Sequence, residues 1–372
     1  MSDTTSKAPL AGLRVLELAR ILAGPWAGQT LADLGADVLK IESPDGDDTR
    51  KWGPPFIEGE DGETSAAYFH ACNRGKRSAI VDFRTETGRD TVRRLVADAD
   101  VVIENFKRGG LAQYGLDYDS LAALNPRLIY CSITGFGQTG PYADRAGYDF
   151  IIQAMSGVMD LTGEPDGPPQ KMGVAFADVF TGLYSTIAIQ AALAEREKSG
   201  LGQHIDMSLL DCMTGVLANQ AMNYLASGQT PKRMGNRHPN ITPYEAVPVS
   251  DGWIILAVGN DKQFERFCQV VGLEAKPEWS GNTGRIKDRD ALGEAISTLT
   301  AQWTRDELLK ALEAATVPAG PINSVEDALK DPQITARGLV GEYGLNSPIR
   351  FSRSATVTGG APALGRDAPD WL

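Results

Sequence analysis

Short apolar runs alternate with helix-like stretches through the first half of this 372-residue chain. Residues 13–18 form a compact apolar run that is typical of a buried strand. Gly24 and Pro25 open a helical pattern that reaches Leu34, and residues 36–42 form a second apolar run. A strand, a helix and a second strand in this order predict a βαβ unit, which needs a parallel strand pair and a right-handed crossover.

The alternation continues toward the middle of the chain. Strand-like runs cover residues 78–83, 101–105 and 128–134, and helical patterns cover residues 87–97 and the neighbourhood of Ser120. Strands interleaved with helices are typical of an open, mostly parallel sheet. We therefore predict an α/β fold with a Rossmann-like large domain.

A long, mostly apolar helix is predicted from about Asp178 to about Lys198, because small and apolar residues recur there at helical spacing. Gly200 is suited to the left-handed position that ends many helices. A short strand over residues 204–207 and an apolar helix over residues 209–225 are predicted to follow.

The composition changes over residues 227–243, which are polar and rich in Gly, Pro and Asn. Such a stretch is typical of a linker or an active-site loop. Beyond it, residues 253–258 favour a strand and residues 261–271 favour a helix, and Thr304 with Glu307 forms a capping box at the start of another helix. We predict a smaller α/β domain here.

The length and a 42% share of hydrophobic residues favour two domains over a single core. A formal net charge of −12 argues against nucleic acid as the main partner. The four cysteines are far apart and form no C-x-x-C pair, which indicates free thiols in a reducing compartment. The N-terminus lacks the apolar stretch of a secretory signal, and no apolar run approaches the length of a membrane span. We expect a soluble, cytoplasmic protein that binds neither nucleic acid nor membrane.

Several common catalytic classes find no support in the sequence. The turn over residues 23–28 lacks the G-x-G-x-x-G spacing of a dinucleotide site, and Pro25 stands where the backbone should approach a pyrophosphate. No G-x-S-x-G motif of a serine hydrolase is present. The three histidines, His70, His204 and His238, have no metal-ligand spacing, so we expect no metal site.

Asp178 is the strongest catalytic candidate that the residues themselves indicate. A carboxylate in the first turn of a helix lies near unpaired N–H groups and the positive end of the helix dipole. Both favour its ionised form, whereas burial opposes it. A desolvated, directed carboxylate is suited to attack on a carbonyl carbon. The alternative is an ordinary aspartate at a helix start, which is common.

Two further segments have the composition of ligand-binding loops. Residues 104–110 end a predicted parallel strand, and their Asn, Phe and two cations could hold an adenine and phosphates. A solvated basic loop explains these residues equally well. The glycines of residues 134–141 would let backbone N–H groups approach an anion, but the pattern is also that of an ordinary loop. Tyr148 with Asp149 more often has a structural role.

Several blocks of the sequence, in the same order, resemble the class III coenzyme A transferase family, which also contains the α-methylacyl-CoA racemases. The resemblance covers nearly the whole chain and includes the Asp178 helix. It rests on the blocks LAGLRVLELARILAGPWAGQTLADLGADVLKIESPDGDDTRKWGPPF, NRGKRSAIVDF, VIENFKRGGLAQYGLDYDSL, NPRLIYCSITGFGQTGPYADRAGYDF and VPAGPINSVEDAL.

The resemblance implies that Asp178 is the nucleophile. Its carboxylate would attack the thioester of an acyl-CoA donor and form a mixed anhydride. CoA thiolate would convert this anhydride to an aspartyl-CoA thioester before the acceptor acid takes over the activation. An ordinary aspartate is ionised at neutral pH, so we expect no general base. The expected substrate is a coenzyme A thioester, with no permanently bound cofactor.

The CoA contacts of the family match residues in three parts of the chain, which are Ile21, Leu22, Ala23, Arg84, Asn105, Phe106 and Lys107. Gln113 and Tyr148 also fall at cofactor positions. Two departures stand out, because the family often carries Arg where this chain has Gln113 and a basic residue at or just after Ser43. Lys107, Arg108 or Arg50 could replace the missing cations.

Position 148 separates the two branches of the family. The racemases carry a histidine there that exchanges the α-proton, whereas this chain has Tyr148. A tyrosine hydroxyl ordinarily ionises near pH ~10 and is a poor base at neutral pH. We therefore expect a transferase. A racemase is the alternative, and a non-catalytic acyl-CoA-binding protein is less favoured while Asp178 is present.

The family fold implies an interlocked homodimer in which each subunit forms a ring threaded by the other. We accordingly expect residues 1–226 to form the N-terminal part of the large domain. A linker and small domain would cover residues 227–330, and residues 331–372 would return to the large domain. Arg237 or His238 in the linker is expected to hold the acceptor carboxylate. The sequence blocks resemble the branch that uses succinyl-CoA and dicarboxylic acids.

Overall fold

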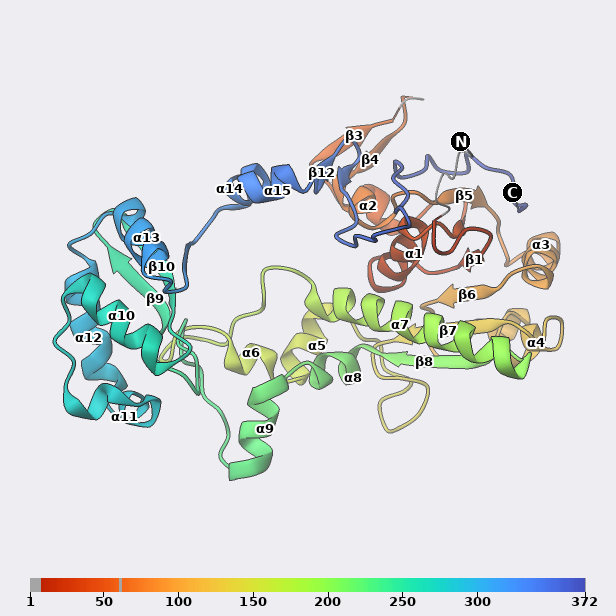
Figure 1. Ribbon diagram of the computed structural model, residues 1–372. Helices are drawn as coiled ribbons and strands as arrows, with labels where there is room; N and C mark the ends of the chain where they lie inside the picture. The colour runs from red at the N-terminus through yellow and green to blue at the C-terminus, as the bar shows by residue number, and fades with distance from the viewer. Residues whose placement is uncertain (1–7, 60–61, 372) are drawn as a thin grey trace. The chain divides into compact units, whose positions relative to one another are not determined.

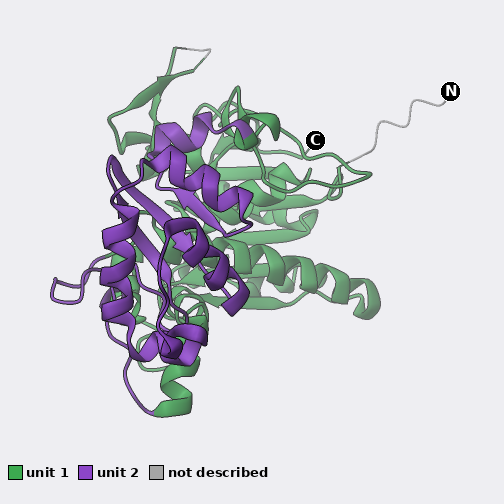
Figure 2. Ribbon diagram, turned by 60° about the vertical axis from the view of Figure 1, so that its left-hand side comes forward, with its two compact units in different colours: residues 1–158, 171–227, 333–372 green, residues 159–170, 228–332 purple. Residues whose placement is uncertain are grey.

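The computed structural model describes residues 8–59 and 62–371. The N-terminal residues 1–7, part of the stretch considered above for a secretory signal, lie outside this range. The chain divides into two compact units, which Figure 2 colours separately. The large unit comprises residues 1–158, 171–227 and 333–372, and the small unit comprises residues 159–170 and 228–332.

A parallel sheet forms the centre of the large unit (Figure 1). Within the described residues it has six strands in the order β5-β2-β1-β6-β7-β8, each parallel to its neighbours. The strand order reverses between β1 and β6, where open α/β sheets form ligand crevices. This confirms the predicted open parallel α/β sheet. The strands are Arg14–Glu17 (β1), Asp37–Glu42 (β2), Arg77–Ile80 (β5), Val101–Glu104 (β6), Ile129–Thr134 (β7) and His204–Ser208 (β8).

Helices cover both faces of this sheet. Alternate strand residues point to opposite faces, so Val15 lies in one hydrophobic cluster and Leu16 in the other. Burial on both faces explains why the strands are continuous apolar runs in the sequence. The first cluster includes residues of α1 (Ala23–Asp33) and α7 (Phe176–Ser199), and the second includes residues of α3 (Glu86–Ala97) and α4 (Tyr118–Ala122).

Helix α7 packs closely against α1, and Gly182 makes this approach possible. A Cβ atom added at Gly182 would lie 2.7 Å from the carbonyl oxygen of Ala23 and 2.9 Å from Cβ of Trp26. By length and composition α7 would also suffice to cross a membrane, although polar residues interrupt its apolar positions. Its packing against α1, α5, α8 and β7 accounts for this composition, because a helix inside a globular core is equally apolar.

Two sequence-based predictions for this region have different outcomes. Helix α7 ends beside Gly200, whose φ of 77° is left-handed as predicted. The predicted single helix over residues 209–225 is wrong, because the chain forms α8 (Leu209–Gly215) and α9 (Ala218–Ser227) instead. Ala218 has a φ of 48°, which a continuous right-handed helix does not allow.

The remaining elements of the large unit are short. Helices α6 (Val158–Leu161) and α15 (Pro332–Ala336) fall where the chain passes from one unit to the other. The others are the helices Ala67–Cys72 (α2) and Asp149–Met155 (α5), the 3-10 helices Asp48–Lys51 (η1) and Ala112–Tyr114 (η2), the hairpin of Phe56–Glu58 (β3) with Thr64–Ala66 (β4), and the hairpin of Val340–Gly341 (β12) with Gly344–Leu345 (β13).

The C-terminal segment, blue in Figure 1, belongs to the large unit. The N–H of Gly75 donates to the carbonyl oxygen of Gly360, and the N–H of Asp367 donates to that of Ser78, each at 2.9 Å. These bonds attach the segment beside β5, which periodicity in the sequence alone did not indicate.

The small unit is built on an antiparallel sheet of three strands, counted over the described residues, in the order β11-β10-β9. The predicted capping box is confirmed, since the side chains of Thr304 and Glu307 each accept a hydrogen bond from the other residue's N–H. Sequence periodicity missed β9 and α12. The elements are Tyr244–Val249 (β9), Gly252–Ala257 (β10), Ala319–Pro321 (β11), Asp261–Val271 (α10), Pro277–Ser280 (η3), Asn282–Lys287 (α11), Arg289–Thr300 (α12), Arg305–Ala314 (α13) and Val325–Lys330 (α14).

We predict that Gly182→Ala destabilises the large unit by about 1–3 kcal/mol, because the added methyl group overpacks the contact between α7 and α1. Urea denaturation followed by circular dichroism measures this change. Gly215→Ala is the matched control, since it adds a methyl group to a helical glycine that meets no atom within 4 Å. The control should leave stability unchanged or raise it slightly. Equal stability of the two variants would contradict the packing role of Gly182.

Candidate active site

Asp178 lies in the first turn of α7, as the third residue of the helix. Ala175, which precedes the helix, provides no side-chain cap. Asp149 at the start of α5 supplies one instead, because its Oδ1 accepts a hydrogen bond at 2.9 Å from the N–H of Ala177, 28 positions later in the chain. The backbone next to Asp178 is therefore anchored to α5.

Gln153 extends this anchor. Its Nε2 donates to Oδ2 of Asp149 at 2.7 Å, and its Oε1 accepts from the N–H of Met172 at 2.9 Å. Gln153 is fully buried. One side chain of α5 thus fixes both the capping carboxylate and the segment that leads into α7. The sequence gives no local sign of this arrangement, since the cap and the helix lie in separate segments.

Burial and the nearby carboxylate of Asp149 raise the pKa of Asp178 to about 7. The expectation that Asp178 is fully ionised at neutral pH is therefore wrong, because desolvation and the charge of Asp149 both favour the protonated form. Roughly half of these carboxyl groups carry a charge near pH 7. The side chain of Asp178 is only partly buried, so solvent still reaches it.

Tyr68 of α2 lies within electrostatic reach of Asp178, and sequence analysis missed it. Burial, together with the negative charge of Asp178, raises the pKa of the Tyr68 hydroxyl to about 12. The hydroxyl therefore keeps its proton at neutral pH and can donate a hydrogen bond. The Tyr68 ring packs edge-on against Trp52, with 5.3 Å between the ring centroids.

The turn after β1 carries the first predicted CoA contacts, Ile21, Leu22 and Ala23. Ile21 is partly buried and has a left-handed φ of 71°, and the next two residues are buried. Asn105, which follows β6, binds Arg20 on both sides. Its Oδ1 accepts from the N–H of Arg20 at 2.9 Å and its Nδ2 donates to the Arg20 carbonyl oxygen at 2.6 Å. Asn105 therefore shapes this turn at the point where the strand order reverses.

Phe106 belongs to an aromatic group at the same end of the sheet. Its ring meets that of Phe83 edge-on at 5.7 Å, and Phe83 meets Tyr114 at 5.5 Å. The guanidinium of Arg20 lies 5.9 Å from the centre of the Phe106 ring. Glu104 accepts a hydrogen bond from the N–H of Phe106 at 2.8 Å, which fixes the backbone there. These rings form an apolar surface of the kind on which an adenine can stack.

Two arginines considered for the CoA phosphates already have carboxylate partners. Arg84 is exposed, and its guanidinium donates to both oxygens of Asp82 at 2.8 and 2.9 Å. Arg50 is buried and donates to both oxygens of Glu42 at 2.8 and 2.7 Å. Arg50 is therefore engaged by a carboxylate inside the protein, and its role as a replacement phosphate ligand stays a prediction.

Lys107 and Gln113 lie on the surface near η2, and both are exposed. Gln113 donates to the carbonyl oxygen of Gly110 at 2.9 Å. Arg108 forms an ion pair with Asp144 at 3.1 Å. Lys107 forms no ion pair with any residue that the structure describes, so it is available to a phosphate without giving up a carboxylate partner.

Tyr148 directly precedes Asp149 at the start of α5 and is 63% exposed. It therefore lies beside the start of α7, because Asp149 caps that helix. The structure thus gathers two groups in the large unit, Asp178 with Tyr148 and the Ile21 turn with Asn105. Tyr68 links these two groups. The charges of Asp178 and Asp47 both raise the pKa of its hydroxyl, and Asp47 accepts a hydrogen bond from the N–H of Ile21.

Arg237 and His238 lie in the small unit. Arg237 donates to Glu245 from Nε at 3.0 Å and to Asp290 from Nη1 at 2.6 Å. Nδ1 of His238 accepts from the N–H of Asn240 at 3.1 Å. Arg237 thus already has two carboxylate partners, and its role and that of His238 stay predictions.

A cavity of about 1720 Å³ lies in the large unit, lined by parts of α1, α2, the β3–β4 hairpin and the C-terminal segment. Asp178 is not among its lining residues, although Leu183 of the same helix is. Asp178 therefore lies outside this cavity. Across residues 8–59 and 62–371, no group of three or more His, Cys, Asp or Glu side chains is arranged to hold a metal ion.

Comparison with known proteins gives the family. The CoA-transferase family III matches residues 10–368. A succinate–glutarate CoA-transferase of Agrobacterium fabrum is 63% identical over 338 residues, covering 90% of this chain and 84% of the relative. A human succinyl-CoA:glutarate CoA-transferase is 40% identical over 345 residues, covering 92% of this chain and 78% of the relative.

Solved structures agree with this family. The crystal structure of a CaiB/BaiF family protein from Brucella suis has a TM-score of 0.88 at 63% identity, covering 96% of this chain and 97% of that one. A protein from Mycobacterium tuberculosis has a TM-score of 0.86 at 30% identity, covering 97% of this chain and 98% of that one. Because sequence and fold agree along nearly the whole length, this chain belongs to the CoA-transferase family III and is a class III CoA-transferase.

Proposed function

We propose that this enzyme moves coenzyme A from succinyl-CoA to a dicarboxylic acid, with Asp178 carrying first the acyl group and then CoA. The names of the relatives support the substrates, because they describe transfer between succinate and glutarate. The placement of Asp178 carries the mechanism. Asp178 lies in the first turn of α7, and its surroundings destabilise its ionised form. The chain matches the family over residues 10–368.

In the first step the ionised carboxylate of Asp178 attacks the thioester carbonyl carbon of the donor. The carbon–sulfur bond breaks and its electron pair leaves with sulfur as CoA thiolate, so a mixed anhydride joins Asp178 to the succinyl group. The attack needs no proton transfer, since the carboxylate already holds the attacking electron pair. The protonated fraction of Asp178 must lose its proton to solvent first, because its pKa is about 7.

In the second step CoA thiolate attacks the aspartyl carbonyl carbon, and succinate leaves as a carboxylate. The product is an aspartyl-CoA thioester on Asp178. The acceptor carboxylate then attacks this thioester, forms a second anhydride and releases thiolate, which attacks the acceptor carbonyl carbon and regenerates the Asp178 carboxylate. Each step exchanges one activated acyl group for another, so the sequence needs no external energy source.

The tetrahedral intermediates require donors for a developing oxyanion. The N–H of Phe176 already donates to the carbonyl oxygen of Val174 at 2.8 Å, and that of Ala177 donates to Asp149. These two groups at the start of α7 are therefore engaged by the fold. The Tyr68 hydroxyl lies within electrostatic reach of Asp178 and keeps its proton at neutral pH. We therefore favour it as the hydrogen-bond donor to the oxyanion.

We further propose that the enzyme is an interlocked homodimer in the cytoplasm. Large apolar side chains are exposed on α7 and α9, and apolar surface of this kind marks protein–protein contacts. These side chains are Leu183, Tyr184, Ile187, Met222, Tyr224 and Leu225. The cavity of about 1720 Å³ offers room for a partner chain. The free, buried state of all four cysteines suits a reducing compartment.

Hydroxylamine trapping tests the nucleophile. With succinyl-CoA present, hydroxylamine should inactivate the enzyme and leave a hydroxamate on residue 178, which peptide mass spectrometry detects. Asp178→Asn should lose at least about 1000-fold in transfer rate and form no adduct. Asp211→Asn is the matched control, because Asp211 is likewise in the first turn of a helix but is exposed. Normal transfer by the Asp178 variant would rule out this mechanism.

The pH dependence of kcat/KM for the donor tests the pKa of Asp178. Because only the ionised carboxylate attacks and its pKa is about 7, the rate should fall about tenfold per pH unit below that value and level off above it. Asp149→Asn removes the neighbouring charge and lowers this pKa, so the fall should begin about one pH unit lower. Asp144→Asn, which alters an exposed aspartate of the preceding loop, should leave the profile unchanged. If the natural enzyme, Asp149→Asn and Asp144→Asn had the same pH profile, the proposed effect of the Asp149 charge on the pKa of Asp178 would be contradicted.

A screen of acyl-CoA donors against carboxylic acids, followed by mass spectrometry of the CoA products, tests the substrates. We expect succinyl-CoA with glutarate or a similar dicarboxylate to give kcat/KM at least about tenfold above monocarboxylates, because a second carboxylate adds charge-assisted contacts. The same assay in deuterated water with an (R)-2-methylacyl-CoA and no acceptor detects racemase activity. Rapid α-deuteration without transfer would instead favour the racemase.

A further inference from the structure

Ile21 has a backbone conformation that its side chain disfavours. Its φ of 71° is left-handed, a region that β-branched L-residues rarely enter because Cβ crowds the backbone. Such an outlier persists only where the surrounding structure over-determines it, and these positions cluster at functional sites. The residues that hold Ile21 therefore reveal what the turn after β1 requires.

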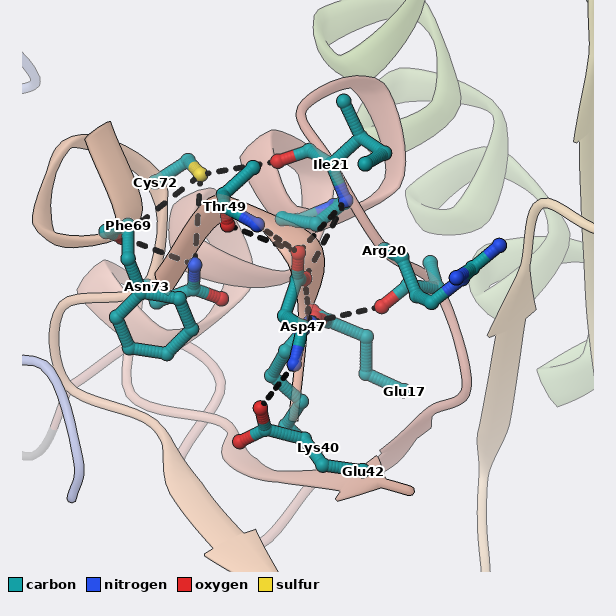
Figure 3. Close-up of polar contacts among 12 residues, drawn as sticks. Glu17, Arg20, Ile21, Lys40, Glu42, Asp47, Thr49, Phe69, Cys72 and Asn73 are labelled. Atoms are coloured by element: carbon teal, nitrogen blue, oxygen red, sulfur yellow. Dashed lines mark hydrogen bonds and ion pairs between the residues drawn. The ribbon is translucent and has the colours of Figure 1, made fainter. Parts of the chain in front are cut away.

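Asp47 and Cys72 hold the two backbone polar groups of Ile21 (Figure 3). The N–H of Ile21 points between the two carboxylate oxygens of Asp47, at 3.4 Å from Oδ1 and 3.3 Å from Oδ2. The carbonyl oxygen of Ile21 accepts a hydrogen bond from Sγ of Cys72 at 3.5 Å. Burial raises the pKa of Cys72 to about 12, so this sulfur keeps the proton that it donates.

The preceding residue is held in the same way. Asn105 accepts from the N–H of Arg20 and donates to its carbonyl oxygen, at 2.9 and 2.6 Å. All four backbone polar atoms of Arg20 and Ile21 are thus bound by side chains, which come from three segments far apart in the sequence. A turn that merely connected β1 to α1 would not need side chains to bind all of these backbone atoms.

Asp47 is itself fixed rigidly. Its Oδ2 lies 2.9 Å from Nζ of Lys40, and its Oδ1 accepts from N–H and Oγ1 of Thr49 at 3.0 and 2.8 Å. Its own N–H donates to Glu42 at 2.9 Å. Although burial alone would raise the pKa of Asp47, Lys40 and Thr49 hold it below its usual value. The carboxylate that faces Ile21 therefore stays charged and keeps both acceptor oxygens.

We propose that Asp47 is a positioning residue that holds Ile21 in its left-handed conformation and so shapes the turn that binds coenzyme A. The inference rests on the proposed function and on the family resemblance, which implies that residues 21–23 contact the cofactor. Asp47 also balances the charge of Lys40, whose other partners are Glu17 at 3.0 Å and the carbonyl oxygen of Ala19 at 2.7 Å, so its loss lowers stability as well. Among the residues that the structure describes, Asp47 supplies the carboxylate that accepts from the N–H of Ile21.

Two measurements on the full-length enzyme test this role: the Kd of free CoA by titration calorimetry, and kcat and KM for succinyl-CoA. Without its clamp, Ile21 leaves the binding-competent conformation most of the time, and apparent affinity falls by the competent fraction. Asp47→Ala should therefore raise Kd and KM about tenfold and change kcat less than about threefold. Asp47→Asn keeps an oxygen that accepts from Ile21, so it should bind CoA nearly as well as the natural enzyme while losing thermal stability.

The Ile21→Gly background separates positioning from general stability. Glycine adopts a left-handed φ without strain, so adding Asp47→Ala to Ile21→Gly should raise Kd less than about threefold further. If Asp47→Ala does not fold, Asp47→Ser replaces it, because serine still caps Thr49 but is too short to reach Ile21. A folded Ala or Ser variant with Kd and KM within about twofold of the natural enzyme would overturn the proposal. So would an equal loss of affinity in both backgrounds.

A control distinguishes this role from the mere loss of a buried carboxylate. Asp33 is buried and pairs with Arg74 at 3.1 Å in the same unit, away from the Ile21 turn. Asp33→Asn should lower the melting temperature but leave the Kd of CoA unchanged. Failure of the proposed function would appear differently, as absent CoA exchange in the natural enzyme or normal exchange in Asp178→Asn. The calorimetric Kd reports on the Asp47 clamp in either case.

Discussion

A network of buried lysines and carboxylates beneath the first βα turn is the interaction on which the site depends. Nζ of Lys40 lies 3.0 Å from Glu17 and 2.9 Å from Asp47, and Nζ of Lys76 lies 2.8 Å from Glu17. All four side chains are excluded from solvent. Removing one member would leave an uncompensated buried charge, which typically costs about 3–5 kcal/mol. The network therefore fixes the carboxylate of Asp47 against Ile21 with little freedom to shift.

Helix α1 connects this network to Asp178, the proposed nucleophile. It begins in the turn that Asp47 and Asn105 shape, and α7 packs against its first residues where Gly182 leaves no side chain between the two backbones. The turn and the start of α7 are thus attached to one rigid helix. Because parallel strands end together, the reversal of strand order between β1 and β6 also brings Asn105 to the same place. The packing of α1 against α7 and the reversal of strand order thus position the proposed CoA contacts relative to Asp178.

Local patterns in the sequence predicted the parts of the structure that depend on local forces. Alternating apolar runs and helices predicted the parallel sheet, and Thr304 with Glu307 predicted a helix start. Contacts between distant segments left no such signal. The capping of α7 by Asp149 links positions 28 residues apart, and Arg50, which the sequence offered as a replacement cation, binds Glu42 inside the protein. Such partners are chosen by the folded chain, so only the structure identifies them.

The pKa of Asp178 illustrates how two opposing forces combine at the proposed nucleophile. The helix start favours the charge, but burial and the like charge of Asp149 win and raise the pKa to about 7. A more basic carboxylate is a stronger nucleophile, and at this pKa a large fraction is still ionised at neutral pH. Once acylated, Asp178 is neutral, so the burial and the charge of Asp149 that destabilise the free carboxylate no longer oppose it. The same surroundings would therefore favour the proposed covalent intermediates over the ionised resting state, which is the bias expected of an acyl carrier.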